Sequence, residues 1–208
     1  MTLILHSIAP GSYRTVVNLT QQSHLYGPGG SASGPETEAL ALQLEGINID
    51  ILVLDRSTIT NHDLRLILRA MPTIQTLYIL ERSIGSKTSQ NLVRPIESSV
   101  GSDNVRFPKI HTLYLWDCYL NARDDPNLDK FKEMVISHGI QELGLRGGMA
   151  TPMLVQSSPI VLFDDPEADQ YTTPIKEWLR DNVPQFKMIK ELNDLPHYNR
   201  QEKFWQLW

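Results

Sequence analysis

The apolar positions of the chain follow one pattern that recurs along its middle part. An aliphatic residue is followed three and five positions later by Leu or Ile, then by a small or polar residue, and then by another aliphatic. The copies are Ile49, Leu52, Leu54, Ser57 and Ile59; Ile74, Leu77, Ile79, Arg82 and Ile84; Ile110, Leu113, Leu115, Cys118 and Leu120; and, more weakly, Ile140, Leu143, Leu145 and Gly148. Their first residues are 25, 36 and 30 positions apart. Periods of this length are typical of stacked repeats.

Each copy combines two periods, which predict a short strand followed by a helix. The alternation of Leu52 and Leu54 predicts a strand. The helical spacing of Leu64, Ile67, Leu68 and Met71 predicts a helix over 61–71, which Pro72 ends. Because such a strand and helix each expose one apolar face, neighbouring units must stack to cover both. The sequence therefore predicts an α/β fold: an irregular solenoid of four to five units, with parallel strands on the concave side and helices on the convex side.

This pattern divides the chain into three parts. Residues 1–36 are expected to form an N-terminal cap or degenerate repeat, with a strand near 14–19 and a flexible Gly-rich loop over 27–34. The repeats occupy 37–150, with Pro35 in the first turn of a helix before them, a helix opening over 86–91, an inserted loop over 97–104 and a helix around Leu128, Phe131, Met134 and Val135. Beyond Ala150 the repeat is lost, and 151–208 is a capping extension. It has a strand at 160–163 and a helix that Thr173-Pro174 begins and Val183 ends.

The quoted residues resemble the leucine-rich-repeat family, in particular the cysteine-containing type of F-box-associated proteins. The third unit, residues 110–120, is the nearest match, with Cys118 at the signature position. The segments around Met71-Pro72 and Gly139–Leu143 resemble repeats of fungal F-box-like proteins. The resemblance covers roughly residues 40–150, without an F-box segment, and implies a recognition module alone. The alternative from the residues themselves is an α/β domain whose buried strands share Leu-x-Leu.

Stacked strands would align the residues between the leucines in columns on the concave face. One column holds Val53, Tyr78, Tyr114 and Gly144, the next Asp55, Leu80, Trp116 and Arg146, and a third Ile51, Thr76, Thr112 and Glu142. Since Tyr, Trp and Arg dominate interface hot spots, we expect partner binding through Val53, Asp55, Tyr78, Leu80, Tyr114, Trp116 and Arg146. Gly144 would leave space beside Tyr114 for a partner's side chain. Two alternatives stay open: the tyrosines brace adjacent strands, or a terminal extension covers the face.

Composition narrows the classes of partner. The net charge of −5 and the pI of about 5.7 supply no basic surface for nucleic acid or anionic lipid. The single cysteine excludes an intramolecular disulfide, and no apolar run is long enough for a membrane span or a signal peptide. We therefore expect an intracellular, cytoplasmic protein that binds another protein, as a substrate-recognition adaptor or an inhibitor, without a cofactor or metal.

Candidates for catalysis and metal binding are weak in this sequence. Cys118 could be a nucleophile with His111 or His138, but its place in the repeat favours a buried, inert thiol. Asp124-Asp125 and Asp164-Asp165 are typical of solvated turns, and residues 85–88 lack the spacing of a phosphate loop. The alternative function is an enzyme with a site between the repeats and the C-terminal extension. The aromatic tail, Phe204, Trp205, Leu207 and Trp208, is expected to cap the last repeat or to act as a linear motif.

Overall fold

The structure, a computed structural model, describes residues 2–7, 15–20, 35–45, 48–55, 61–81, 83–95, 107–121, 125–150, 160–166 and 169–191. Within these ranges, strands and helices alternate along most of the chain. The strands are β1 (Thr2–Ser7), β2 (Thr15–Thr20), β3 (Ile51–Asp55), β4 (Thr76–Leu80), β5 (Ser83–Ile84), β6 (Thr112–Asn121), β7 (Glu142–Ala150), β8 (Ile160–Leu162) and β9 (Gln185–Met188). The helices are α1 (Pro35–Leu44), α2 (Asn61–Ala70), α3 (Ser86–Leu92), α4 (Asp125–His138) and α5 (Asp169–Asn182).

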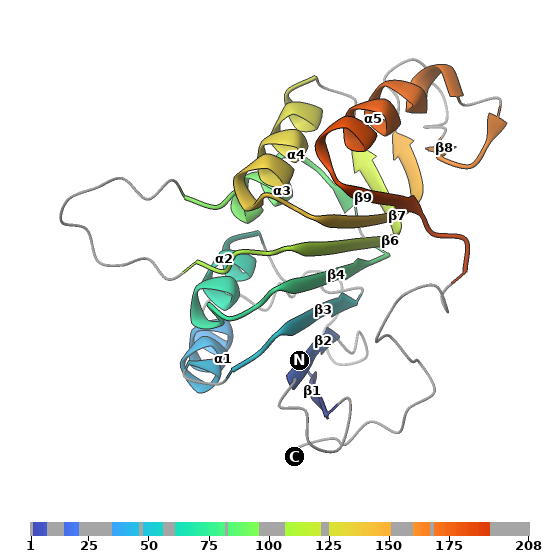
Figure 1. Ribbon diagram of the computed structural model, residues 1–208. Helices are drawn as coiled ribbons and strands as arrows, with labels where there is room; N and C mark the ends of the chain where they lie inside the picture. Colours follow the sequence, from blue (N-terminus) through green and yellow to red (C-terminus); the bar gives the residue numbers. More distant parts are fainter. Residues whose placement is uncertain are drawn as a thin grey trace, which may run out of the picture.

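The strands form one mixed sheet that is mostly parallel. Its order is β1-β2-β3-β4-β6-β7-β8, with β5 beside β6 and β9 beside β7. Strands β2, β3, β4, β6, β7 and β9 run parallel to one another. Strand β1 pairs antiparallel with β2, and β8 pairs antiparallel with β7. Helices α1 to α4 stack beside one another along one side of this sheet (Figure 1). The prediction of an α/β fold is confirmed.

The leucines of the four sequence copies lie in adjacent strands. Leu52 is in register with Leu77, Leu77 with Leu113, and Leu113 with Leu143. All four side chains have 0% exposure, and they share one core with apolar residues of the helices, among them Leu64, Ile67, Leu68, Phe131 and Met134. Burial of each such side chain contributes roughly 1.5–3 kcal/mol. The apolar pattern therefore specifies both the register of the sheet and the side that the helices cover.

In three of these strands, the leucine-bearing stretch is followed by a residue with a positive φ angle. Glu81, Asp117 and Gly147 have φ angles of 52°, 48° and 132°, in each case four residues after the first leucine of the strand. At Gly147 a Cβ atom would lie 2.0 Å from the carbonyl oxygen of Cys118, so a larger residue does not fit. The Cys118 thiol is fully buried and donates to the carbonyl oxygen of Ile79 at 3.1 Å. The same turn therefore occurs in three strands, and the hydrogen bond of Cys118 joins β6 to β4.

The parallel sheet continues beyond Ala150, where the leucine pattern ends. Helix α5 leads into β9, which pairs with β7 and brings Phe186 beside Leu143 and Met188 beside Leu145. The leucine pattern did not predict β9, because Phe186 and Met188 stand beside the two leucines of β7. The same core also receives Leu179 of α5, at 0% exposure.

Several predicted boundaries agree with the structure and others need correction. The start of α1 at Pro35 and the strands near 14–19 and 160–163 are confirmed as α1, β2 and β8. Thr173 is not a helix cap, because α5 begins at Asp169 and contains Pro174. The predicted loops over 27–34 and 97–104, and the aromatic tail, lie outside the described residues. No described helix is both long and apolar enough to cross a bilayer.

Candidate binding face

The side chains between the core leucines gather on the sheet face that points away from the helices. There Ile51, Val53, Tyr78, Leu80 and Tyr114 form a second apolar cluster, against which Trp116 packs. We call these six residues the aromatic face. The register places Val53 beside Tyr78 and Tyr78 beside Tyr114, and the last two rings stack with centroids 4.8 Å apart. The predicted columns lie in register and two of them continue onto β7, with Gly144 beside Tyr114 and Glu142 beside Thr112, whereas a register shift separates Arg146 from Trp116.

Most of this face is buried, contrary to the open surface that the sequence analysis expected. Val53, Tyr78, Leu80 and Tyr114 are only 1–3% exposed. Burial raises the pKa values of both tyrosine hydroxyls well above their ordinary range, with a further contribution from Glu142. The two alternatives left open by the sequence, bracing of adjacent strands and coverage by an extension, both describe this arrangement better than a free surface does.

The space expected beside Gly144 is filled from within the chain. A Cβ atom on Gly144 would lie 2.5 Å from Cδ1 of Tyr114 and 2.6 Å from Cδ1 of Ile189. Ile189 directly follows β9, is 4% exposed and belongs to the apolar cluster of the aromatic face. Glycine at 144 thus allows the C-terminal extension to pack on Tyr114, and does not leave a cavity for a partner.

Tyr114, Glu142 and Lys187 form a polar group at the edge of the aromatic face. The Tyr114 hydroxyl donates to Oε1 of Glu142 at 2.7 Å, and the Lys187 ammonium donates to the same oxygen at 2.8 Å. The Lys187 nitrogen also lies 5.2 Å from the centroid of the Tyr114 ring. Burial alone would raise the pKa of Glu142, but the two hydrogen bonds and the lysine charge outweigh it and hold the pKa low. The carboxylate therefore stays ionised and ties β6, β7 and β9 together.

Trp116 and Arg146 make the accessible part of the face. The Arg146 guanidinium lies over the Trp116 ring, 4.3 Å from its centroid, and donates from Nε to Oδ1 of Asp117 at 3.2 Å. It also donates to the backbone carbonyl of Lys190, just after β9. The Arg146 and Asp117 side chains are 40% and 44% exposed. Trp116 is half-buried. Of Asp55, the remaining predicted site residue, only the backbone register beside Leu80 is described.

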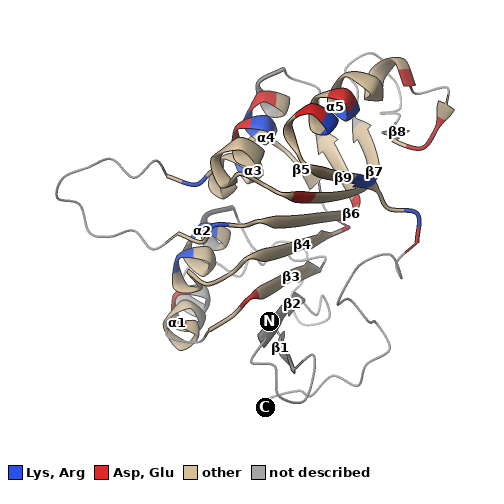
Figure 2. Ribbon diagram, viewed as in Figure 1, with Lys and Arg blue, Asp and Glu red and all other residues tan. Residues whose placement is uncertain are grey.

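Charged residues are distributed unevenly between the two sides of the molecule. Figure 2 shows Lys, Arg, Asp and Glu along helices α2, α4 and α5, and few of them on β3, β4 and β6. The ion pairs of Arg146 with Asp117 and of Lys187 with Glu142 are therefore the polar rim of a largely uncharged sheet face.

Two of the weak candidates for catalysis, Cys118 and His138, have structural roles. Cys118 is buried and bonded to a backbone carbonyl, as the repeat position predicts. His138 is buried too, and its ring contacts the backbone of Leu92 and Ile110. Within the described ranges no group of three His, Cys, Asp or Glu residues could hold a metal ion.

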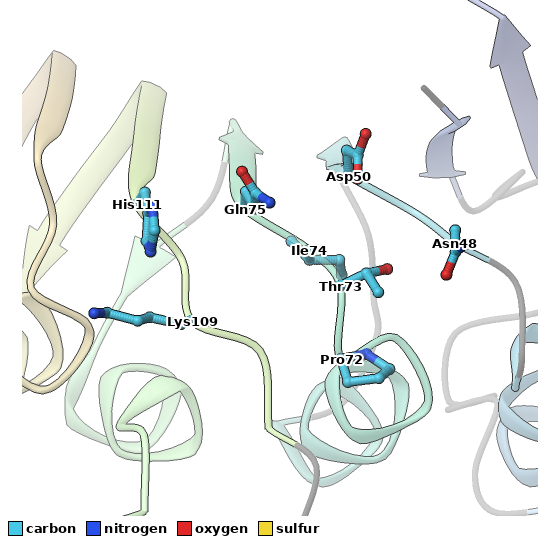
Figure 3. A pocket seen from close by; sticks show the side chains of 8 residues that line it. All are labelled: Asn48, Asp50, Pro72, Thr73, Ile74, Gln75, Lys109 and His111. Atoms are coloured by element: carbon cyan, nitrogen blue, oxygen red, sulfur yellow. The ribbon is translucent and has the colours of Figure 1, made fainter. Parts of the chain in front are cut away.

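A shallow pocket of about 500 Å³, which the sequence did not predict, lies where three strands begin (Figure 3). Its lining comes from the segments before β3, β4 and β6: Asn48, Asp50, Pro72, Thr73, Ile74, Gln75, Lys109 and His111. The backbone carbonyls of Asp50, Gln75 and His111 each accept two N–H groups of the following unit. This repeated hydrogen-bonding pattern places the lining residues of the three segments side by side.

The pocket is not at the place where the sequence analysis put the site of the alternative enzyme. Its only hydroxyl, that of Thr73, is bonded to the backbone N–H and carbonyl of Ile49. The enzyme alternative placed a site between residues 151–208 and the repeats, whereas this pocket is lined by residues between 48 and 111.

Known proteins provide no further guide to this face. Comparisons of the chain with protein-family models, with curated proteins and with solved structures found no match.

Proposed function

We propose that the chain is a protein-recognition module of leucine-rich-repeat type, which binds a partner protein through the sheet face opposite its helices. The parallel register of Leu52, Leu77, Leu113 and Leu143 supports the repeat architecture. So does the stacking of α1 to α4 on the other side. Repeat proteins of this kind use the surface formed by their aligned strands for binding.

The pair of Trp116 and Arg146 is the observation that carries the proposal. The two side chains stack at 4.3 Å and are only partly buried, while Asp117 and the Lys190 carbonyl fix the guanidinium. Trp and Arg contribute most often to interface hot spots, and a side chain held in place before binding loses less conformational freedom on association. The stacked rings of Tyr78 and Tyr114, on the same sheet face, support this surface.

The rim around this pair matches the usual anatomy of a protein interface. Lys187, Glu142, Asp117 and Arg146 place charges of both signs beside an aromatic centre. A partner with its own charges of both signs around an apolar side chain would satisfy these groups, whereas a polyanion would meet two carboxylates.

The test compares a face variant with a control on the helix side. The partner is first captured from the native host with the wild-type chain and then purified. We expect the double variant Trp116→Ala/Arg146→Ala to bind that partner at least about 10-fold more weakly in calorimetric titration, because hot-spot truncations cost about 2 kcal/mol or more.

The control variant, Leu42→Ala/Ile136→Ala, truncates two side chains of α1 and α4 that are 72% and 62% exposed. Its affinity for the partner should equal that of the wild type. Equal affinity of the face variant and the wild type, with circular dichroism unchanged, would overturn the assignment of the face. Weakening by the control alone would move the interface to the helices.

A further inference from the structure

The aromatic face is more deeply buried than the described residues on it explain. Ile51 and Val53 of β3 are each 3% exposed, and Tyr78 and Leu80 of β4 are 1% and 2% exposed. The described apolar residues that pack on this cluster from outside β3 and β4 belong to β6 or follow β9. Since β9 is separated from β3 by β7, β6 and β4, about 19 Å at the usual strand spacing, Ile189 does not reach β3. A further cover is needed over β3 and β4.

We propose that this cover is the chain's own C-terminal segment, residues 192–208, which docks on the aromatic face and competes with the partner for it. The competition rests on the proposed function, but the docking itself does not. Three features of the described chain and the sequence support the docking.

The first feature is the direction in which the described chain ends. After β9, Ile189 packs on Tyr114, and Arg146 of the sheet face donates to the Lys190 carbonyl. The backbone is therefore held on the aromatic side of the sheet at the point where the segment 192–208 begins.

The second feature is reach. Residues 191–204 can span up to about 45 Å when extended, more than twice the distance of about 19 Å from β9 to β3. A tether of this length also gives an effective concentration on the order of millimolar, so a weak intramolecular contact is well populated.

The third feature is composition. Residues 192–208 contain Leu192, Leu195, Tyr198, Phe204, Trp205, Leu207 and Trp208. Aromatic side chains bury roughly 150–250 Å² each, and stacking on tyrosine rings adds about 0.5–1.5 kcal/mol. The Gly- and Ser-rich segment 21–34, which follows β2 and precedes α1, has far fewer apolar side chains to offer.

The docking has a consequence for recognition. A partner that uses the aromatic face must displace the segment, so its apparent affinity falls by the fraction of molecules in which the face is open. The segment thus acts as an intramolecular competitor. The more strongly its aromatic residues bind the face, the lower is the apparent affinity of the partner.

Photo-crosslinking in the full chain tests the docking without any partner. p-Benzoylphenylalanine replaces Trp205, the protein is irradiated at low concentration, and the monomer is digested and analysed by mass spectrometry. We expect crosslinks to the peptides that contain β3 and β4. Crosslinks confined to α5 and β9, crosslinks between molecules only, or no crosslink would each overturn the proposal. As a control, the same residue at Ile136, which is exposed on α4, should not crosslink to β3 or β4.

A second measurement uses side chains that cannot dock. In the variant Phe204→Asn/Trp205→Asn/Leu207→Asn/Trp208→Asn, the fluorescence of the apolar dye ANS should rise several-fold while far-UV circular dichroism is retained. The matched variant Arg200→Gln/Glu202→Gln/Lys203→Gln should leave dye binding unchanged. Unchanged fluorescence in the first variant would contradict the docking. If docking is found but the first variant binds the partner no more tightly than the wild type, the proposed use of the face fails and the docking stands.

Discussion

At the scale of single residues, His138 shows how one buried polar side chain links three elements. It is the last residue of α4 and has 0% exposure. Its Nδ1 accepts from the backbone N–H of Ile110 at 3.2 Å, and its Nε2 lies 2.6 Å from the carbonyl oxygen of Leu92. Because a carbonyl only accepts, the proton of the neutral ring is on Nε2. The ring therefore joins α3, α4 and the segment before β6.

Acid should weaken the protein through this histidine. Burial lowers the pKa of His138 to about 4; the hydrogen bond to Leu92 opposes the shift, and the charges of Arg94 and His111 add to it. The unfolded chain, with a histidine pKa near 6.5, binds the proton first as pH falls. The stability that His138 contributes is therefore present above about pH 6.5 and is lost as pH falls towards 4, by about 3 kcal/mol.

Urea unfolding at several pH values between 7 and 4 measures this effect. We expect His138→Gln to be less stable than the wild type at pH 7, but to lose clearly less stability on acidification. His111→Gln changes an exposed histidine whose charge is the smallest of the causes that shift the pKa of His138, so it should keep most of the wild-type pH dependence. If His138→Gln and the wild type lose the same free energy between pH 7 and 4, His138 does not carry the dependence.

The residue scale also shows where prediction from sequence stopped. The place of Cys118 in the repeat predicted its burial, and the structure buries this side chain within β6. The burial of Tyr78 and Tyr114 was not predictable in the same way. Their neighbours on one side follow from the register, but the cover over Tyr114 comes from Ile189, which is distant in sequence and belongs to a unit that the leucine pattern did not reveal.

At the scale of elements, the leucine spacing predicted that β3, β4, β6 and β7 are adjacent strands. It could do so because the strand and helix spacings of apolar residues are local properties of the chain. It failed for β9, where Phe186 and Met188 occupy the core positions. It also failed for the start of α5, since the cap expected at Thr173 lies within a helix that begins at Asp169. Apolar size and shape vary among such positions without changing the fold, so a pattern defined on leucine alone underestimates the number of units.

Helix α5 should behave as part of the common core and not as an appendage. Leu179 has 0% exposure and shares its cluster with Leu143 and Leu145 of β7. We expect Leu179→Ala to lower the free energy of unfolding by about 2–5 kcal/mol, because it removes a fully buried side chain. The urea transitions followed by far-UV circular dichroism and by tryptophan fluorescence should still coincide.

A separate C-terminal unit would give a different outcome. Two transitions would appear, and only the earlier one would shift in Leu179→Ala. The control Ile136→Ala, at a side chain of α4 that is 62% exposed, should change stability by less than about 0.5 kcal/mol.

At the scale of the whole molecule, neighbouring segments contact one another both through paired strands and through adjacent helices. Lys132 of α4 lies over the Trp178 ring of α5 at 5.6 Å, and Ser137 of α4 accepts from the backbone N–H of Arg94 after α3 at 3.0 Å. The pocket at the strand starts is a product of this stacking. Its lining residues form no motif in any one segment, which is why only the assembled molecule reveals it.

The same stacking predicts a gradient of protection from hydrogen exchange. Strands β4, β6 and β7 have paired neighbours on both sides, and β4 and β6 contribute to apolar clusters on both faces, whereas β1 and β8 end the sheet order and α1 exposes Leu42 at 72%. Interior strands can open only by breaking two strand interfaces, while the strands at the ends of the sheet break one. The amides of β4, β6 and β7 should therefore exchange only through global unfolding, with the free energy that urea denaturation gives.

Native-state exchange at increasing urea measures this gradient strand by strand. Amides of β1, β8 and α1 should exchange with smaller free energies that depend little on urea and then merge with the global value. Exchange of β4 several kcal/mol below that of β7 would mean that the sheet divides between β4 and β6, since the Leu77 and Leu113 interface would then open by itself. Because that interface also carries the stacked rings of Tyr78 and Tyr114, its opening would separate the two halves of the aromatic face.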